Sequence, residues 1–140
     1  MKKLTIIGLL VVIVAVLFLL HLLHRQHVAS VARFDHAFRQ QLAGVWLRQE
    51  VGMRCTNTVA ADGSFVELSW FSHPDRTNTY QWTGTWLVKD GSLIETVKTS
   101  TNPSEVTPHS LAGRIVRADA SGFTVRWPNS AETAWQRITK

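Results

Sequence analysis

The sequence predicts a mainly β protein. In it an antiparallel meander of about eight strands closes into a small barrel, behind an N-terminal transmembrane helix and a short amphipathic helix. Three observations predict this class. The first residues are almost wholly apolar, turn signals recur roughly every ten residues after position 44, and apolar and polar side chains alternate between those turns. A chain of 140 residues has room for about one such domain.

Residues 1–23 form the predicted transmembrane signal-anchor. The segment Leu4–Leu23 has no charged residue, and as a helix it spans about 30 Å, the thickness of the hydrocarbon core of a bilayer. A cleaved signal peptide is the alternative, because Ser30-Val31-Ala32 has the small-x-small pattern of a cleavage site. The apolar region of a signal peptide is usually about 7–15 residues long. This one is longer, so we expect an uncleaved single-pass anchor.

Charges on either side of the apolar segment predict its orientation. Lys2, Lys3 and the α-amino group precede it, and Arg25 and Arg33 follow it. The more positive flank of a membrane helix tends to remain in the cytoplasm. We therefore expect a protein of the bacterial inner (cytoplasmic) membrane whose C-terminal domain lies in the periplasm.

Residues 24–43 form a predicted connector that contains the short amphipathic helix. Apolar residues recur at steps of three and four from Val31 to Leu42, and polar residues fill the other face. Ser30 is suited to start this helix and Gly44 to end it. The apolar stripe needs a partner, which could be the β-domain, the bilayer surface or another chain.

Residues 44–140 form the predicted barrel domain. Asp62-Gly63 and Asp90-Gly91 each stand between apolar runs, which is typical of a tight hairpin turn. Too few residues separate the runs for crossover helices, so neighbouring strands should pair antiparallel. The predicted strands are 45–51, 53–60, 64–72, 79–89, 92–100, 111–118, 123–127 and 132–138.

Aromatic side chains dominate the predicted inner face of the barrel. Tyr80, Trp82 and Trp86 share one face of a single strand, and we expect such residues mainly to fill the core. Trp70 has the opposite parity from Phe65, so it is the better candidate for an exposed contact surface. The possible ligand or partner contacts are therefore Trp70, Tyr80, Trp82 and Trp86.

Two arginines form a second candidate surface. Arg114 and Arg126 have the polar parity of adjacent predicted strands and are expected to be cross-strand neighbours. They could simply be solvated, or they could contact an acidic partner or lipid headgroups. The net charge of +5 falls to +3 once the two anchor lysines are set aside. That charge is too small and too scattered to indicate nucleic acid as a partner.

No pattern of catalytic or metal-ligating residues emerges, so we predict neither an enzyme nor a cofactor. Glu67 and Glu95 are single acids within strands and are expected to face solvent. The lone Cys55 is expected to be a small buried side chain without a disulfide. His73 and Asp75 lie on one predicted loop and His109-Ser110 on another. They could form an acid–base group only if the two loops met.

Short motifs at the two ends of the domain resemble the lipocalin superfamily. Gly44-Val45-Trp46 opens the first predicted strand directly after a helix, and Trp135-Gln136-Arg137 stands in the last. The resemblance covers roughly 42–138 and includes the stretch Gly84-Thr85-Trp86. It implies a closed barrel in which Gly44 and Trp46 begin the first strand and Arg137 packs across the indole of Trp46.

Two functions follow from the sequence. The favoured one is a non-enzymatic interaction or accessory domain held at a membrane, because many large inward side chains in a short barrel indicate a filled core. The alternative, implied by the resemblance to lipocalins, is the binding of a small apolar ligand or lipid at the membrane surface. The size of the barrel interior discriminates between them.

Overall fold

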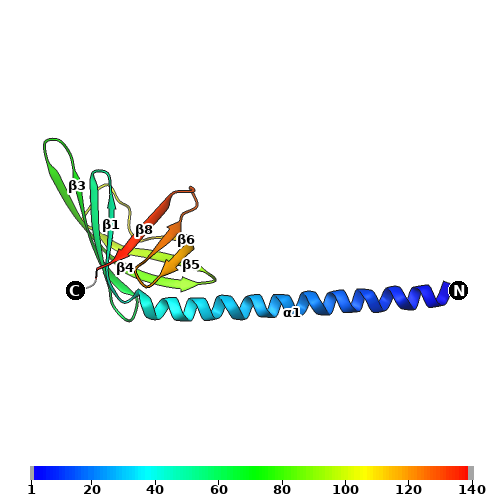
Figure 1. The fold of residues 1–140 in the computed structure, drawn as a ribbon. Coiled ribbons are helices and arrows are strands. Elements are labelled where there is room, and N and C mark those ends of the chain that lie inside the picture. The colour runs from blue at the N-terminus through cyan, green and yellow to red at the C-terminus, as the bar shows by residue number, and fades with distance from the viewer. Residues whose placement is uncertain (1, 139–140) are drawn as a thin grey trace. The chain divides into compact units, whose positions relative to one another are not determined.

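The structure is a computed structural model that describes the backbone of residues 2–138 and the side chains from residue 12 onward. The chain divides into two compact units, Met1–Arg33 and Phe34–Lys140. One helix and eight strands make up the described chain (Figure 1). Their bounds are α1 Lys2–Leu42, β1 Gly44–Glu50, β2 Met53–Val59, β3 Ser64–Ser72, β4 Thr77–Lys89, β5 Ser92–Ser100, β6 His109–Asp119, β7 Gly122–Arg126 and β8 Glu132–Arg137.

Helix α1 is continuous where the sequence predicted a membrane helix, a connector and a separate short helix. The reason is local, because no glycine or proline occurs between Leu9 and Ala43, and those two residues are the strongest helix breakers. The expected amphipathic segment is therefore the last part of a longer helix. The predicted stop at Gly44 agrees with the structure, since β1 begins there.

The first unit contains a candidate membrane span. From Val12 onward α1 is long and apolar enough to cross a bilayer, with a mean hydropathy of 1.6 over its most apolar window. The apolar side chains from Val12 to Leu23 are exposed along this part of the helix. The predicted segment also includes Leu4 to Val11, whose side chains lie outside the described ones.

The eight strands form a closed antiparallel barrel in the order β1 to β8. Each strand pairs with the next along the chain, and β1 pairs with β8 through Trp46 opposite Arg137 and Leu47 opposite Gln136. The predicted fold class is thereby confirmed, and the strand bounds agree to within about two residues. Closure removes the two free edges that an open sheet would expose.

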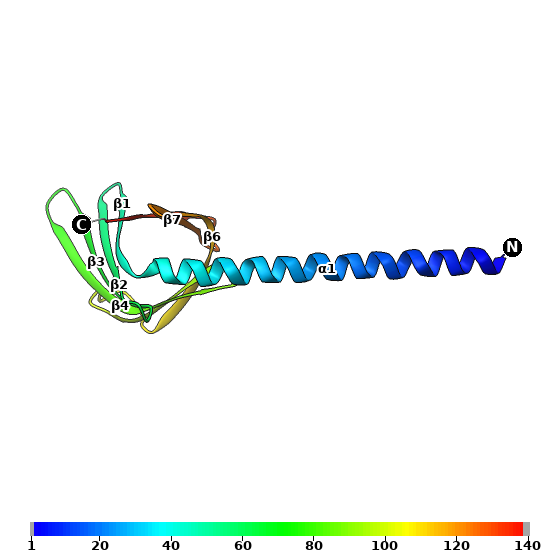
Figure 2. The same cartoon turned by 60° about the horizontal axis from the view of Figure 1, so that its bottom comes forward.

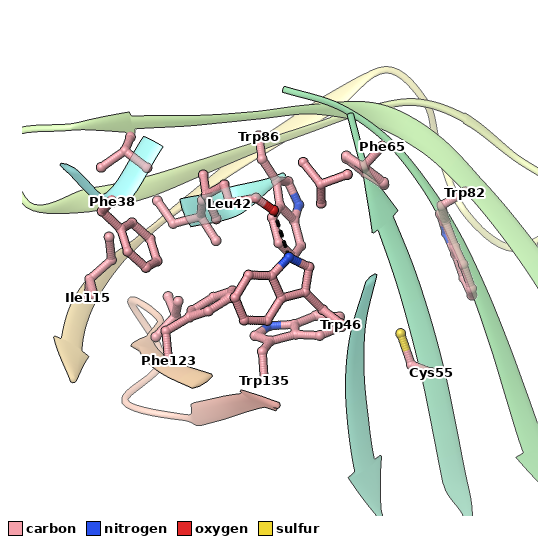
Figure 3. Packing of buried hydrophobic residues seen from close by; sticks show 14 of the residues in the cluster. Phe38, Leu42, Trp46, Cys55, Phe65, Trp82, Trp86, Ile115, Phe123 and Trp135 are labelled. Atoms are coloured by element: carbon pink, nitrogen blue, oxygen red, sulfur yellow. Dashed lines mark hydrogen bonds between the residues drawn. The ribbon is translucent and has the colours of Figure 1, made fainter. Parts of the chain in front are cut away.

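The last turns of α1 close one end of the barrel. Phe38 and Leu42 are buried in the same cluster as Trp46, Trp86 and Phe123, and Figure 2 shows this end of the helix among the strands. The apolar stripe at this end of α1 therefore has the β-domain as its partner. Figure 3 shows the aromatic side chains that surround Trp46.

Polar contacts fasten α1 to the turn between β4 and β5. The Asp35 carboxylate accepts hydrogen bonds from the backbone N–H of Asp90 at 2.6 Å and of Gly91 at 2.9 Å. The Nε of Arg39 donates to the carbonyl of Val88 at 2.7 Å. Both turn residues have positive φ, 53° at Asp90 and 71° at Gly91, as the predicted tight Asp-Gly hairpin requires.

Candidate functional site

Arg137 and Trp46 meet where the barrel closes. The Cζ atom of Arg137 lies 4.6 Å from the centroid of the Trp46 ring, which is within the range of a cation–π contact. The guanidinium also donates to the carbonyls of Ala43, at 3.3 Å, and Gln41. It thereby satisfies backbone acceptors at the C-terminal end of α1, where a positive charge is favoured.

Gly44 belongs to the same contact. Its φ is +145°, and a Cβ built on it would lie 2.9 Å from Nη1 of Arg137. Trp46 donates its indole N–H to the carbonyl of Leu42 at 2.7 Å (Figure 3). These contacts bring together the three residues that the resemblance to lipocalins had singled out, and they hold strand ends and helix in place.

The barrel interior changes character along its axis. Next to α1 it is aromatic, with Phe123 packed edge-on against Trp46 at 4.9 Å and Trp86 packed against Trp135 at 5.3 Å between ring centroids. Beyond that layer several inward side chains are polar. We call this second layer the polar belt, and its members are Arg48, Cys55, Asn57, Glu67, Ser69 and Glu95.

The sequence-based expectation that Glu67 and Glu95 face solvent is wrong. Strand residues two apart lie on the same face, so Glu67 shares the inward face of the buried Phe65, and Glu95 that of the buried Leu93. Parity alone could therefore have placed both acids inside. We expected both acids outside because carboxylates are mostly exposed to solvent in proteins.

Neutral donors surround Glu67. Asn57 donates to one carboxylate oxygen and Ser69 to the other, each at 3.0 Å. The amide oxygen of Asn57 is buried and has no hydrogen-bond partner among the described residues. Burial, and then the charge of Glu67, raise the pKa of the Cys55 thiol. The predicted buried cysteine is thereby confirmed, and a protonated thiol of this kind is unreactive.

A cavity of about 450 Å³ opens at the end of the barrel opposite α1. Apolar and charged side chains both line it. The sequence had favoured a barrel with a filled interior, and the cavity corrects that expectation. Leu111 is 45% exposed even though its parity is that of the inward-facing Ile115, so the cavity is open to solvent. Its lining includes Arg48, Glu95, Val97, His109, Leu111, Trp127 and Thr133.

The cavity exists because strands separate toward this end. The ladder between β1 and β8 has only two residue pairs, and neither includes Arg48. Strand β6 continues to His109, beyond its last pairing with β7 at Arg114. The indole N–H of Trp127 donates to the Thr133 hydroxyl at 2.8 Å, which fixes that ring at the wall of the cavity.

Glu95 is electrostatically unusual. Burial and then the charge of Glu67 raise its pKa from the ordinary 4.5 to about 7. Arg48 opposes that rise, but its Nε also donates to Glu50 at 2.8 Å. The indole N–H of Trp86 also opposes the rise in the pKa of Glu95. This N–H has no partner within hydrogen-bond distance among the described residues.

The aromatic candidates from the sequence lie elsewhere. Trp86 is in the aromatic layer, and Trp82 is buried and donates to Glu105. Tyr80 is half-buried against Trp82, with 5.9 Å between ring centroids, and Trp70 is half-buried on the outward face. None of the four is part of the cavity wall.

The arginine candidates form a separate exterior surface. Arg114 and Arg126 are directly opposite each other on β6 and β7, so the predicted cross-strand pair is confirmed. Arg126 also pairs with Glu132 at 2.7 Å. Both side chains are exposed and neither lines the cavity.

His109 and Ser110, which the sequence placed on a loop, begin strand β6, and each has a nearby partner. His109 lies 3.5 Å from Glu105, and its Nδ1 is 3.0 Å from the carbonyl of Val106. Ser110 shares a hydrogen bond with Thr96 at 2.8 Å. Among the side chains that the structure describes, no group of three or more His, Cys, Asp or Glu could hold a metal ion.

No family model matches this chain. No curated protein matches it either. Among solved structures, the chain is similar to a lipocalin-like protein from Bacteroides uniformis, with 13% sequence identity and a TM-score of 0.49 over 70% of this chain and 99% of the other. The barrel topology described above rests on the strand pairing of this chain itself.

Proposed function

We propose that this protein is a membrane-anchored binding protein whose barrel holds a small ligand in the cavity opposite α1. One observation carries this proposal: the aromatic layer fills only the end of the barrel next to the helix, and a cavity of about 450 Å³ remains at the other. That volume lies in the range of about 300–1,000 Å³ typical of small-molecule sites. The binding alternative from the sequence therefore fits the geometry better than a filled accessory barrel.

The lining of the cavity suggests an amphipathic ligand. Val97, Leu111 and Trp127 supply apolar surface, while Arg48 and Glu95 supply charge. Such sites usually combine an apolar wall with a few polar groups that fix the orientation of the ligand. A purely apolar ligand would cover the Glu95 carboxylate without giving it a partner, which is costly. The described site offers no reacting group in need of a cofactor, and the proposed role is non-enzymatic.

Filling the cavity should abolish ligand retention. Leu111→Trp adds bulk at an inward position that is already exposed, so the barrel should tolerate it. Native mass spectrometry of the full-length protein, purified in detergent from its own host, should show a small molecule on the parent and none on Leu111→Trp. The matched control is Leu87→Trp on the outward face of β4, which should retain the ligand. A protein partner in place of a small molecule on the parent would favour the accessory role.

The proposed address is the inner membrane, with the barrel in the periplasm. The apolar span of α1 from Val12 supports the anchor, and Lys2 and Lys3 support a cytoplasmic N-terminus. Alkaline phosphatase fused after Lys140 is active only outside the cytoplasm, so the fusion should be active. Carbonate extraction should leave the fusion in the membrane pellet. Activity of a cytoplasm-only reporter at the same position would reverse the orientation.

A further inference from the structure

We propose that the ligand carries a cationic group, an ammonium or a guanidinium, which the carboxylate of Glu95 binds at the inner end of the cavity. This inference rests on the proposed binding function and names the chemical class of the ligand. It stands on three observations about the polar belt and the cavity wall: the balance of charge, the distribution of hydrogen-bond donors, and the position of Glu95 itself.

The balance of charge around Glu95 is negative. Glu67 and Glu105 both act on it as like charges, and Arg48 is the one opposing charge that acts on it. That arginine is shared with Glu50 at 2.8 Å on the rim. A buried carboxylate is stable when a positive group pairs with it, and the described side chains leave Glu95 short of one.

The charged and polar groups near the belt mostly serve the other carboxylates. Asn57 and Ser69 donate to Glu67, while Trp82 and Ser100 donate to Glu105. The one donor that acts on Glu95 is the neutral indole N–H of Trp86, which supplies no positive charge. Among the described side chains, the amide oxygen of Asn57 is a buried acceptor without a partner, on a side chain with 0% exposure. A ligand rich in N–H donors fits a site with unpartnered acceptors.

The position of Glu95 makes it accessible to a ligand. It lines the cavity, directly opposite Leu111 on the neighbouring strand β6. Leu111 and Trp127 together provide an apolar wall on the path from the mouth. A ligand with an apolar body and a cationic end could place its charge at Glu95 while its body covers that wall. An anionic ligand would have to pair with Arg48 while the carboxylates of Glu67 and Glu95 repel it.

The ionisation of Glu95 gives the inference a pH signature. The groups that act on Glu95 are Glu67 on β3, the indole N–H of Trp86 on β4, Arg48 on β1 and Glu105 before β6. His109 also lines the cavity. The raised pKa of about 7 means that Glu95 is mostly protonated at pH 6. A bound cation stabilises the ionised form. Binding should therefore release a proton near pH 6, and affinity should increase from pH 6 to pH 8.

Three indole compounds of similar size test the inference: tryptamine is a cation, indole-3-propionate an anion and 3-ethylindole neutral. Isothermal titration of each into the full-length protein in detergent measures affinity, and buffers of different ionisation enthalpy report proton release. Tryptamine should bind best. Glu95→Gln should weaken tryptamine roughly tenfold or more, the loss expected for a charged hydrogen bond. It should also remove most of the pH dependence.

The matched control is Glu132→Gln, an exposed acid outside the cavity that pairs with Arg126, and it should bind tryptamine like the parent. The inference is overturned if tryptamine does not bind, if either other compound binds more tightly, or if Glu95→Gln leaves tryptamine binding unchanged. The proposed function fails separately. It is rejected if Leu111→Trp retains the same small molecule as the parent and binds every indole compound with the same affinity. Binding of an anionic or neutral compound that Leu111→Trp abolishes would keep the function and reject the cation.

Discussion

Replacing Trp46 with alanine is expected to lower the free energy of unfolding by about 3–5 kcal/mol, the range for truncating a large buried aromatic side chain. Trp46 is only 1% exposed. Its ring contacts Phe123 and Arg137, and its N–H satisfies the carbonyl of Leu42. The substitution leaves a cavity at the point where α1, β1 and β8 meet. Urea unfolding of the full-length protein in detergent, followed by near-ultraviolet circular dichroism, measures the loss.

Two comparisons make this expectation specific. Trp70→Ala removes the same side chain from the half-buried outward face of β3, and its effect should be clearly smaller. Arg137→Lys should fall between the two, because lysine keeps the charge but cannot stack as a plane or donate to two carbonyls in fixed geometry. If Trp46→Ala were no more destabilising than Trp70→Ala, the Trp46 contacts would not be what holds the barrel closed.

Replacing Glu95 with glutamine is expected to stabilise the protein at pH 8 by about 3 kcal/mol while changing little at pH 4. The pKa of Glu95 is about 7 in the folded protein against an ordinary value of 4.5. Between pH 4.5 and about pH 7, Glu95 keeps its proton in the folded chain but has released it in the unfolded chain. The contribution of Glu95 to stability is therefore present below pH 4.5 and is lost as pH rises to about 7.

Glutamine resembles the protonated acid and does not titrate, so the variant should escape that loss. Urea unfolding of the parent and the variant at several pH values from 4 to 8 gives the difference between their free energies of unfolding. The contributions of the other titrating groups are common to both proteins and cancel in this difference. Glu132→Gln on the exposed surface should show no comparable trend. A parent that gained stability over Glu95→Gln as the pH rose would show that Glu95 is paired in the folded protein, with its charge compensated.

Several elements could be predicted from the sequence because the interactions behind them are local. Asp-Gly pairs such as Asp90-Gly91 place turns, since their backbone conformation suits few other residues. Alternation over a few residues then locates the strands between turns. The stretch from Leu9 to Ala43 was predicted as two helical segments because its composition changes from apolar to mixed, and the structure corrects this to one continuous helix. The Trp46–Arg137 contact came from the resemblance to lipocalins and not from any local pattern.

The prediction of the site depended on assigning each polar residue of a strand to the inner or the outer face of the barrel. Parity shows that Glu95 and Leu93 share a face, but a lone acid in a strand is most often exposed, and that prior led to the wrong face. The outward placement of Arg114 and Arg126 was predictable because both lie on the polar face of adjacent strands. The inward placement of Glu67 and Glu95 followed from the same parity, but it was overruled by the expectation that carboxylates face solvent.

The sequence by itself determined the apolar candidate span, the turns, the strands and their antiparallel order, because each follows from residues close together in the chain. Only the tertiary structure decided which end of the barrel is filled and which is hollow. That outcome depends on α1 entering one end and on β1 separating from β8 at the other. Strands at opposite ends of the domain meet there, and the spacing between them depends on the packing of the whole barrel.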